Sequence, residues 1–337
     1  MKVAINGFGR IGRIVFSLLE EVDNVEVVAI NDLTSAKELA YLLKYDSVHR
    51  KNNYVISYDE DYLLINNKKV KVFKGLDPAM LPWKELEVDY VLECTGKFTK
   101  EELALKHIEA GARKVIVSAP CKGNVKTIVY NVNENIENIL NKDDLIISAA
   151  SCTTNCLAPV LKVLDDEFKV VMGFMTTIHA YTNDQVILDV SHKKGIESRR
   201  GRAAALNIIP TETGAASAIG KVIPSLEGRL SGSAMRVPVG DGSVIDLTLE
   251  LSKKVTKEEI NSIFKEKVNE TLNYTEDPIV SSDVIGCPCG ALVDGLLTDI
   301  LKKDDKTLVK VVAWYDNELG YSSQMVRLIS YMSDNNM

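Results

Sequence analysis

Long apolar runs, clustered cysteines and an excess of basic charge are all missing from this sequence of 337 residues. No apolar stretch approaches the ~18 residues that a membrane-spanning helix needs. Acidic side chains outnumber basic ones by 47 to 40, and the net charge of −7 argues against a general binder of nucleic acids or membrane surfaces. The sequence therefore predicts neither a membrane nor a nucleic-acid partner.

The six cysteines lie at positions 94, 121, 152, 156, 287 and 289 and form no CxxC pair. This cysteine spacing, with only four histidines in the chain, argues against a zinc site. Six cysteines are also too sparse for a disulfide scaffold. The first residues read as a strand and not as a signal peptide. We therefore expect no metal and a cytoplasmic location with reduced thiols.

The first half of the chain alternates strand and helix patterns. Short apolar runs at 3–5 and 25–30 flank a helical pattern that begins near Ile11. A strand at 90–92 leads to a helix over 99–110, with a capping box of Thr99 and Glu102 and a stop at Gly111, and then to a strand at 114–118. Such alternation predicts an α/β fold with a Rossmann-type doubly wound parallel sheet.

After about residue 150 the pattern changes to longer, consecutive strands, expected at 170–178, 231–239, 243–251 and 307–314. A helix is expected over 256–272, and helical periodicity returns at 319–333. This pattern of consecutive strands with few helices predicts a second α+β domain with a mostly antiparallel sheet. At roughly 150 residues per domain, we divide the chain into domains over 1–150 and 151–316, with a C-terminal helix over 317–337 that packs back on the first domain.

A dinucleotide signature follows the first strand. Gly7, Gly9 and Gly12 fit GxGxxG, which provides a tight turn, room for a pyrophosphate and close packing of helix and strand. The N-terminus of the following helix offers unpaired N–H groups to the anion. Asp32 lies 20 positions after Gly12, where a carboxylate meets the ribose 2′-hydroxyl and disfavours a 2′-phosphate. The sequence therefore predicts an NAD-binding domain.

A candidate nucleophile lies at the junction of the two domains. Cys152 follows an apolar strand and precedes a helical run, so we expect it at a helix N-terminus, where the dipole lowers the pKa of a thiol. We interpret Cys156, one turn further along, as structural. Thiolate chemistry needs a base, and His179 at the end of an apolar run is the best-placed of the four histidines.

Arginines are concentrated downstream of these two residues. Five of the ten arginines, at 199, 200, 202, 229 and 236, fall between positions 199 and 236. They are mixed with threonine, serine and glycine, which bind phosphate together with a planar guanidinium. We therefore expect an anionic, phosphorylated substrate.

Five motifs together resemble phosphorylating NAD-dependent glyceraldehyde-3-phosphate dehydrogenases. They are INGFGRIGR at 5–13, SCTTNC at 151–156, HAYTNDQ at 179–185, RVP at 236–238 and WYDNELGYS at 314–322. The resemblance covers essentially the whole chain. It implies conversion of glyceraldehyde 3-phosphate, NAD and inorganic phosphate to 1,3-bisphosphoglycerate and NADH, through a hemithioacetal and a thioester on a catalytic cysteine.

The resemblance also implies residue roles. Cys152 and His179 would be catalytic, and the backbone N–H of Cys152 with His179 would hold the developing oxyanion. The substrate phosphate would be bound by Thr182 and Arg236, and inorganic phosphate by Ser151, Thr153, Thr213, Gly214 and Arg200. Asn317 would bind the nicotinamide carboxamide. The remaining cofactor positions would be Asn6, Gly7, Gly9, Arg10, Ile11, Gly12, Asp32, Thr95, Gly96 and Ser118. A homotetramer is implied as well.

Several alternatives stay open at this point. The loop from His192 to Arg199 is a few residues longer than in many members, which leaves Arg199 and Arg200 as competing candidates. Ser191 occupies a position where many NAD-specific members have proline, so strict preference for NAD over NADP is not settled. A related erythrose-4-phosphate dehydrogenase, with hydrolytic release, and a non-catalytic NAD-binding protein remain alternative functions.

Overall fold

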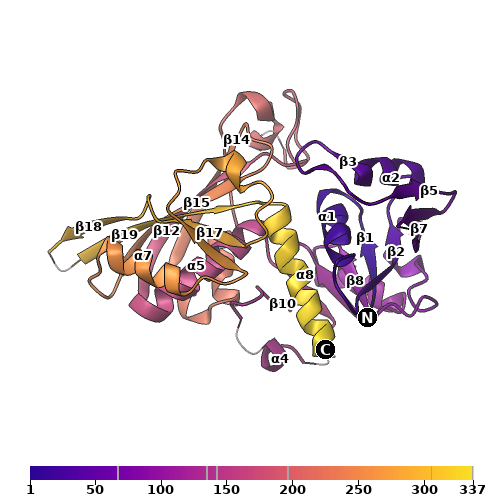
Figure 1. Cartoon of the computed structure of the whole chain (residues 1–337), viewed down its shortest axis with the longest axis horizontal. Coiled ribbons are helices and arrows are strands. Elements are labelled where there is room, and N and C mark those ends of the chain that lie inside the picture. Colours follow the sequence, from indigo (N-terminus) through magenta and orange to yellow (C-terminus); the bar gives the residue numbers. More distant parts are fainter. Residues whose placement is uncertain (67, 134–135, 142, 196, 305, 336) are drawn as a thin grey trace. The chain divides into compact units, whose positions relative to one another are not determined.

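The computed structural model describes residues 1–337 except residues 67, 134–135, 142, 196, 305 and 336. Contacts divide the chain into two compact units (Figure 1). The first comprises Met1–Ser151 with Met325–Met337, and the second comprises Cys152–Gln324.

The first unit contains a nine-stranded sheet in the order β10-β11-β9-β8-β1-β2-β7-β6-β5. All pairs from β10 to β7 are parallel, and β6 and β5 add an antiparallel edge. Figure 1 shows β8, β1, β2 and β7 side by side. The strands are β1 Lys2–Asn6, β2 Glu26–Asn31, β5 Ile56–Tyr58, β6 Tyr62–Ile65, β7 Lys68–Phe73, β8 Tyr90–Glu93, β9 Lys114–Val117, β10 Lys126–Thr127 and β11 Ile146–Ser148, with β3 Tyr45–Asp46 and β4 Arg50–Lys51 in a separate ribbon.

Helices cover both faces of this sheet because alternate residues of each strand point to opposite sides. Val3 and Ile5 of β1 join a buried cluster with side chains of α1, α2 and α8, whereas Ala4 joins a second cluster with Trp83 and with Ala104 of α3. The helices are α1 Arg10–Leu19, α2 Ala36–Lys44, α3 Glu101–Glu109, α4 Ile136–Ile139 and α8 Leu319–Asp334, of which residues 325–334 belong to this unit. The predicted doubly wound α/β sheet is confirmed.

One predicted helix start is wrong. The N-cap of α3 is Lys100, with no side-chain cap, and not Thr99 in a capping box with Glu102. The carbonyl of Thr99 accepts a hydrogen bond from the backbone N–H of Lys122, and Lys100 forms a bridge with the same residue. This pairing holds the backbone extended through residue 100, so the helix begins one residue later. The predicted stop is confirmed, since Gly111 follows the C-cap with φ of 102°.

The second unit is built on an eight-stranded, mostly antiparallel sheet, as predicted. Its order is β13-β14-β12-β15-β19-β17-β16, with β18 paired to β19, and only β12/β14 and β16/β17 are parallel. The strands are β12 Val170–Ala180, β13 Ile209–Glu212, β14 Leu230–Val237, β15 Ser243–Leu251, β16 Leu272–Thr275, β17 Ala291–Asp294, β18 Asp299–Lys303 and β19 Lys306–Tyr315.

In the described part of this unit, the sheet is accompanied by α5 Cys152–Phe168, α6 Ala215–Ala218, α7 Lys257–Glu266 and residues 319–324 of α8. The buried α5 packs on β12, β15, β17 and β19. Thr256 and Glu259 form a capping box at the start of α7. The expected helix over 256–272 nevertheless ends at Glu266, because Leu272 pairs with Ala291 in the sheet.

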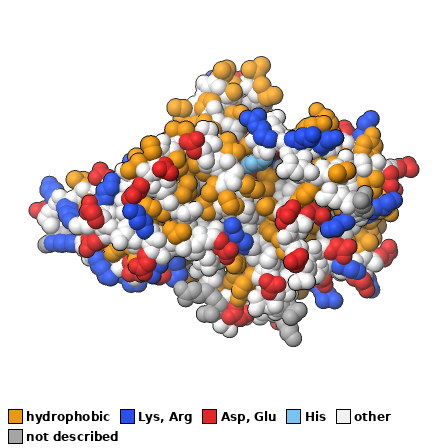
Figure 2. All heavy atoms as spheres, in the orientation of Figure 1, with side chains coloured by type: hydrophobic (Ala, Val, Ile, Leu, Met, Phe, Trp, Pro, Cys, Tyr) orange, Lys and Arg blue, Asp and Glu red, His pale blue; other side chains and the backbone are white. Residues whose placement is uncertain are grey.

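Charged side chains of both signs are intermixed on the face of β18 and β19 seen in Figure 2. Lys310 of β19 pairs with Asp246 of β15 at 2.8 Å, and Lys306 of β19 pairs with Glu250 of β15 at 3.7 Å. No helix in the described part of the chain has the length and apolar character required to cross a bilayer.

Candidate active site

A cysteine and a histidine face each other in the second unit. Cys152 is the first residue of α5, and His179 is the penultimate residue of β12. The Sγ atom of Cys152 lies 3.4 Å from Nε2 of His179. Ala150, two residues before the cysteine, has a left-handed φ of 59°, so the chain turns sharply from β11 into α5. The fold thus brings together the two residues that the sequence predicted as nucleophile and base.

The other ring nitrogen of His179 is also engaged. Nδ1 lies 2.7 Å from the carbonyl oxygen of Ala180 and 2.9 Å from Nη1 of Arg236. A carbonyl oxygen only accepts hydrogen bonds and a guanidinium only donates them, so Nδ1 cannot bond to both. Because Nη1 of Arg236 has the carbonyl of Ala180 as its acceptor, we assign the proton to Nδ1, which leaves the lone pair of Nε2 toward the thiol. Arg236 donates to the same carbonyl at 2.8 Å. The imidazole is therefore oriented to take a proton from Cys152.

Burial controls the charge of both groups. Burial, followed by the charge of Arg236, lowers the pKa of His179 to about 3. Burial raises the pKa of the Cys152 thiol, although Arg236 and the hydroxyl and N–H of Thr153 act in the opposite direction. The expected net lowering of this pKa at the helix N-terminus is therefore wrong for this arrangement, because desolvation outweighs the helix amides. Burial thus favours the uncharged form of each group, and the thiol proton passes to His179 as sulfur attacks.

Arg236 supplies a donor for an anion beside this pair. It is half-buried on β14, and its Nη1 lies 3.5 Å from Oγ1 of Thr182. Its Nε is buried without a hydrogen-bond partner among the residues that the structure describes. A buried donor of this kind costs free energy unless a ligand satisfies it, so Arg236 and Thr182 are suited to a phosphate group.

The two competing arginines differ in their surroundings. Arg199 is exposed, whereas Arg200 is half-buried, pairs with Asp184 at 2.8 Å and donates to Oγ1 of Thr211 at 3.2 Å. The charge of Arg200 contributes to the lowered pKa values of His179 and Arg236. Arg200 therefore acts electrostatically on His179 and Arg236.

The remaining predicted phosphate ligands lie on two helix starts. Thr213 and Gly214 precede α6, where Oγ1 of Thr213 accepts from the N–H of Ala215 at 3.2 Å, and α6 packs against α5. Ser151 directly precedes Cys152 and is half-buried. Thr153 is buried, and its hydroxyl lies 3.0 Å from that of Tyr315. The side chain of Thr153 is thus occupied by an internal contact.

In the first unit, the glycine-rich turn has the shape that a dinucleotide requires. Gly7 has φ of +93°, and a Cβ there would lie 2.7 Å from the backbone N of Thr95. A Cβ on Gly12 would lie 2.1 Å from the carbonyl oxygen of Gly7. Gly9, the N-cap of α1, has only open space where a Cβ would be. The backbone is therefore tightly packed at the first and third glycines and accessible at the second, which fits a pyrophosphate.

The other predicted cofactor residues follow neighbouring parallel strands. Asn6 ends β1, Asp32 follows β2, Thr95 and Gly96 follow β8, and Ser118 follows β9. These four strands are adjacent in the order β9-β8-β1-β2, so their carboxyl ends share one edge of the sheet. Ligands of open α/β sheets bind at this edge. Arg10 and Ile11 lie in the first turn of α1, and Arg10 forms an ion pair with Asp46.

Asp32 is held against the glycine-rich turn. One carboxylate oxygen accepts from the N–H of Phe8 at 2.8 Å, and the other accepts from the N–H of Thr34 at 3.0 Å. These bonds fix the carboxylate while leaving further lone pairs for a ligand hydroxyl.

Comparisons with known proteins agree with this geometry. Residues 1–101 match the family model described as glyceraldehyde 3-phosphate dehydrogenase, NAD binding domain, and residues 151–317 match the model of the C-terminal domain. The chain belongs to the glyceraldehyde-3-phosphate dehydrogenase family. It is an NAD-dependent oxidoreductase, as the sequence predicted.

Curated members of the glyceraldehyde-3-phosphate dehydrogenase family align over nearly the whole chain. The protein of that name from Clostridium pasteurianum is 56% identical over 98% of both chains, and that from Clostridium acetobutylicum is 55% identical over 98% of both. The protein from Streptococcus pyogenes is 49% identical over 99% of this chain and 98% of its own.

The family motifs in the sequence did not reveal a buried hydrogen-bond network beside two of the predicted cofactor residues. The carboxylate of Glu93 accepts hydrogen bonds from the side chains of Asn6 and Thr95 and contacts Nε2 of His107 at 3.3 Å. Trp83 in turn donates to Nδ1 of His107 at 3.0 Å. Glu93 is an unremarkable strand residue by pattern, and only its burial and hydrogen bonds show that it fixes two of the predicted cofactor residues, Asn6 and Thr95.

Sequence reasoning also missed Tyr315, although it lies in the WYDNELGYS motif of the glyceraldehyde-3-phosphate dehydrogenase family. Its hydroxyl bridges Thr153 at 3.0 Å and Thr177 at 2.9 Å, and its ring meets that of His179 edge-on at 5.9 Å between centroids. Tyr315 thereby ties the start of α5 to β12. The motif position was the only signal available in the sequence.

Proposed function

We propose that this chain oxidises glyceraldehyde 3-phosphate with NAD and inorganic phosphate, giving 1,3-bisphosphoglycerate and NADH, with Cys152 as nucleophile and His179 as its base. The observation that carries this proposal is the 3.4 Å contact between Sγ of Cys152 and Nε2 of His179, with Arg236 beside the same imidazole. A thiol, an oriented neutral base and a buried cation form the minimum set for covalent catalysis on an anionic aldehyde.

In the first step, the sulfur of Cys152 forms a bond to the aldehyde carbon, and the carbonyl electron pair moves to oxygen. The thiol proton moves to Nε2 of His179, which then donates to the oxyanion together with the backbone N–H of Cys152. NAD, when bound, supplies the hydride acceptor for this adduct. Phosphate attacks the carbonyl carbon of the resulting thioester, and the carbon–sulfur bond breaks. The leaving thiolate of Cys152 takes back the proton that His179 holds.

Two anion sites follow from the surroundings of this pair. We assign the substrate phosphate to Arg236 and Thr182, which is supported by the unpaired buried Nε of Arg236 among the described residues. We assign inorganic phosphate to Arg200, in preference to the exposed Arg199, together with Thr213, Gly214, Ser151 and the backbone of Thr153.

The cofactor is assigned to the glycine-rich turn and to the residues at the carboxyl edge of the first sheet. The pyrophosphate of the cofactor would lie against the turn and the start of α1, at Gly7, Gly9, Arg10, Ile11 and Gly12. The other ligands in this unit would be Asn6, Asp32, Thr95, Gly96 and Ser118. Asn317 would bind the nicotinamide carboxamide.

Asp32→Gly tests the choice between NAD and NADP. A carboxylate bonds a ribose hydroxyl and repels a 2′-phosphate, so its removal should lower the ratio of kcat/KM for NAD to that for NADP by about tenfold or more. Loss of the bond to Phe8 weakens both cofactors alike, which is why the ratio is measured. Asp23→Gly removes an exposed carboxylate from the same unit and should leave the ratio unchanged. An unchanged ratio in Asp32→Gly would remove Asp32 from the ribose site.

The decisive experiment measures NADH formation from glyceraldehyde 3-phosphate with and without inorganic phosphate. Turnover that requires phosphate, or arsenate in its place, supports the proposal. Turnover independent of phosphate would indicate hydrolytic release, as in an erythrose-4-phosphate dehydrogenase. Absence of turnover with both glyceraldehyde 3-phosphate and erythrose 4-phosphate would indicate a non-catalytic NAD-binding protein.

We also propose a homotetramer in the cytoplasm. Large apolar side chains are exposed on the segment between β12 and β13 and on β12 itself, where Ile187 is 87% and Phe174 is 70% accessible in the single chain. Subunit contacts would cover such side chains. A molar mass in solution near four times 37.2 kDa, measured by light scattering, is expected, and a monomer would contradict it. All six cysteines are thiols, in keeping with a reducing compartment.

A further inference from the structure

Asn317 is held by a short turn whose residues no sequence motif identified. The segment consists of Asp241 and Gly242, which precede β15, and of Ser243, the first residue of β15. The hydroxyl of Ser243 donates to Oδ1 of Asn317 at 2.6 Å, and Oδ1 of Asp241 accepts from the backbone N–H of Asn317 at 3.2 Å. Both the main chain and the amide of Asn317 are therefore fixed by one segment.

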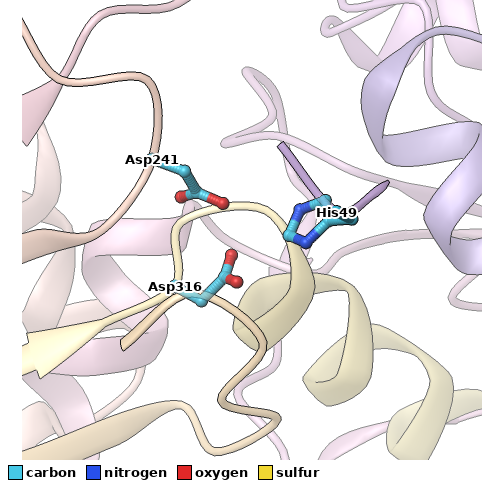
Figure 3. A group of neighbouring side chains, drawn as sticks. All are labelled: His49, Asp241 and Asp316. Carbon is cyan, nitrogen blue, oxygen red and sulfur yellow. The ribbon is translucent and has the colours of Figure 1, made fainter. Parts of the chain in front are cut away.

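The carboxyl groups of Asp241 and Asp316 lie close together beside this segment (Figure 3). Asp316 accepts hydrogen bonds from the backbone N–H groups of Gly286, Glu318 and Leu319 at 2.7–2.9 Å, which hold its carboxylate in place. Burial and the charge of Asp316 raise the pKa of Asp241. The pair anchors the chain on both sides of Asn317.

Ser243 also connects Asn317 to the catalytic histidine. Its Oγ accepts a hydrogen bond from the backbone N–H of Ala180 at 3.1 Å. The carbonyl of the same Ala180 receives Nδ1 of His179 and Nη1 of Arg236. Ala180 is thus a common anchor for the base, for the arginine and, through Ser243, for the amide of Asn317.

This arrangement determines which atom of the Asn317 amide is available. The Ser243 hydroxyl proton points to Asn317, because the amide oxygen Oδ1 can only accept, while the hydroxyl oxygen accepts from Ala180. The carbonyl oxygen of the amide is thereby occupied, and its Nδ2 makes no hydrogen bond with any residue that the structure describes. A free N–H donor is what a ligand carboxamide oxygen requires.

We propose that Ser243 is a positioning residue for the nicotinamide ring, which acts by fixing the Asn317 amide with its N–H group toward the ligand and in register with His179. This inference rests on the role of Asn317 in the proposed function. Without the Ser243 hydroxyl, the amide of Asn317 can rotate by half a turn. Its carbonyl oxygen would then face the carboxamide oxygen of the ligand, and neither atom can donate a hydrogen bond.

The test compares the dissociation constants of NAD and ADP-ribose, measured by titration calorimetry. ADP-ribose lacks the nicotinamide ring, so the ratio of the two constants isolates the part of the affinity that depends on Asn317. In Ser243→Ala, Kd for NAD should rise about 3- to 10-fold, the effect of one lost hydrogen bond, and Kd for ADP-ribose should stay within twofold. Unchanged ADP-ribose binding also shows that the variant is folded.

Two further variants make the test specific. Ser323→Ala removes another buried hydroxyl of the same unit, one without a partner in the described part of the chain, and should leave both constants unchanged. Asn317→Ala should change the ratio at least as much as Ser243→Ala. If Asn317→Ala lowers only NAD affinity and Ser243→Ala does not, or if Ser243→Ala weakens both ligands equally, the positioning role is wrong and the proposed function stands. An unchanged ratio in Asn317→Ala would refute both the role of Asn317 and this inference.

Discussion

Replacement of Cys152 by serine is expected to lower kcat by roughly a thousandfold or more and to leave the Kd for NAD unchanged. A serine hydroxyl is far less acidic than a thiol and a far weaker nucleophile, so the imidazole of His179 activates it much less readily. The substitution changes a single atom of a half-buried side chain at the start of α5. The fold and the cofactor turn in the first unit should therefore be unaffected.

The measurement pairs NADH formation with NAD titration, and Cys156→Ser is the matched control. Cys156 is fully buried one turn further along α5, with Sγ 3.9 Å from the carbonyl oxygen of Ala313. We expect this control to lose some stability but to keep most of its activity. Retention of substantial turnover by Cys152→Ser, or an equal loss in Cys156→Ser, would show that Cys152 is not the nucleophile.

Replacement of Arg236 by alanine is expected to lower kcat/KM for glyceraldehyde 3-phosphate about 10- to 150-fold, equivalent to the 1.5–3 kcal/mol of a charge-assisted hydrogen bond, about 1.4 kcal/mol per factor of ten. The guanidinium lies beside Nδ1 of His179 and has a buried Nε without a partner in the described structure. Its removal also eliminates a charge that lowers the pKa of His179. The pKa should therefore rise toward the ordinary value, and the acid limb of the pH–rate profile should move to higher pH.

Comparison with unphosphorylated glyceraldehyde separates phosphate binding from general damage. The loss in Arg236→Ala should be much larger for the phosphorylated aldehyde than for the unphosphorylated one. Arg229→Ala is the control, because Arg229 is exposed just before β14 and donates to the backbone oxygen of Val170 at 2.6 Å, on the same pair of strands. An equal loss for both aldehydes would place the substrate phosphate elsewhere.

Local sequence patterns were sufficient to predict those features of the protein that depend on residues close together in the chain. The turn from Gly7 to Gly12 must pack a helix against a strand, which only glycine permits, so its role is visible in the sequence. The position of Cys152 at the first residue of α5 follows from an apolar strand, a polar turn and a helical run. The alternation of strands and helices likewise indicated the doubly wound sheet.

Features that depend on residues distant in the chain, such as a helix boundary or a pKa shift, were visible only in the tertiary structure. Pairing with Lys122 displaced the start of α3, which no local capping pattern could reveal. Burial reversed the expected shift of the Cys152 pKa, since desolvation depends on all surrounding atoms and not on the helix dipole alone.

The sequence by itself therefore determined the fold class, the dinucleotide turn and the candidate nucleophile, because each is encoded by neighbouring residues. Only the folded chain showed that His179 is the histidine that meets Cys152, that Arg200 rather than Arg199 is half-buried, and that Ser243 holds Asn317. Such contacts join positions 27 to 74 residues apart. They depend on strand register and side-chain packing, which a single sequence does not display.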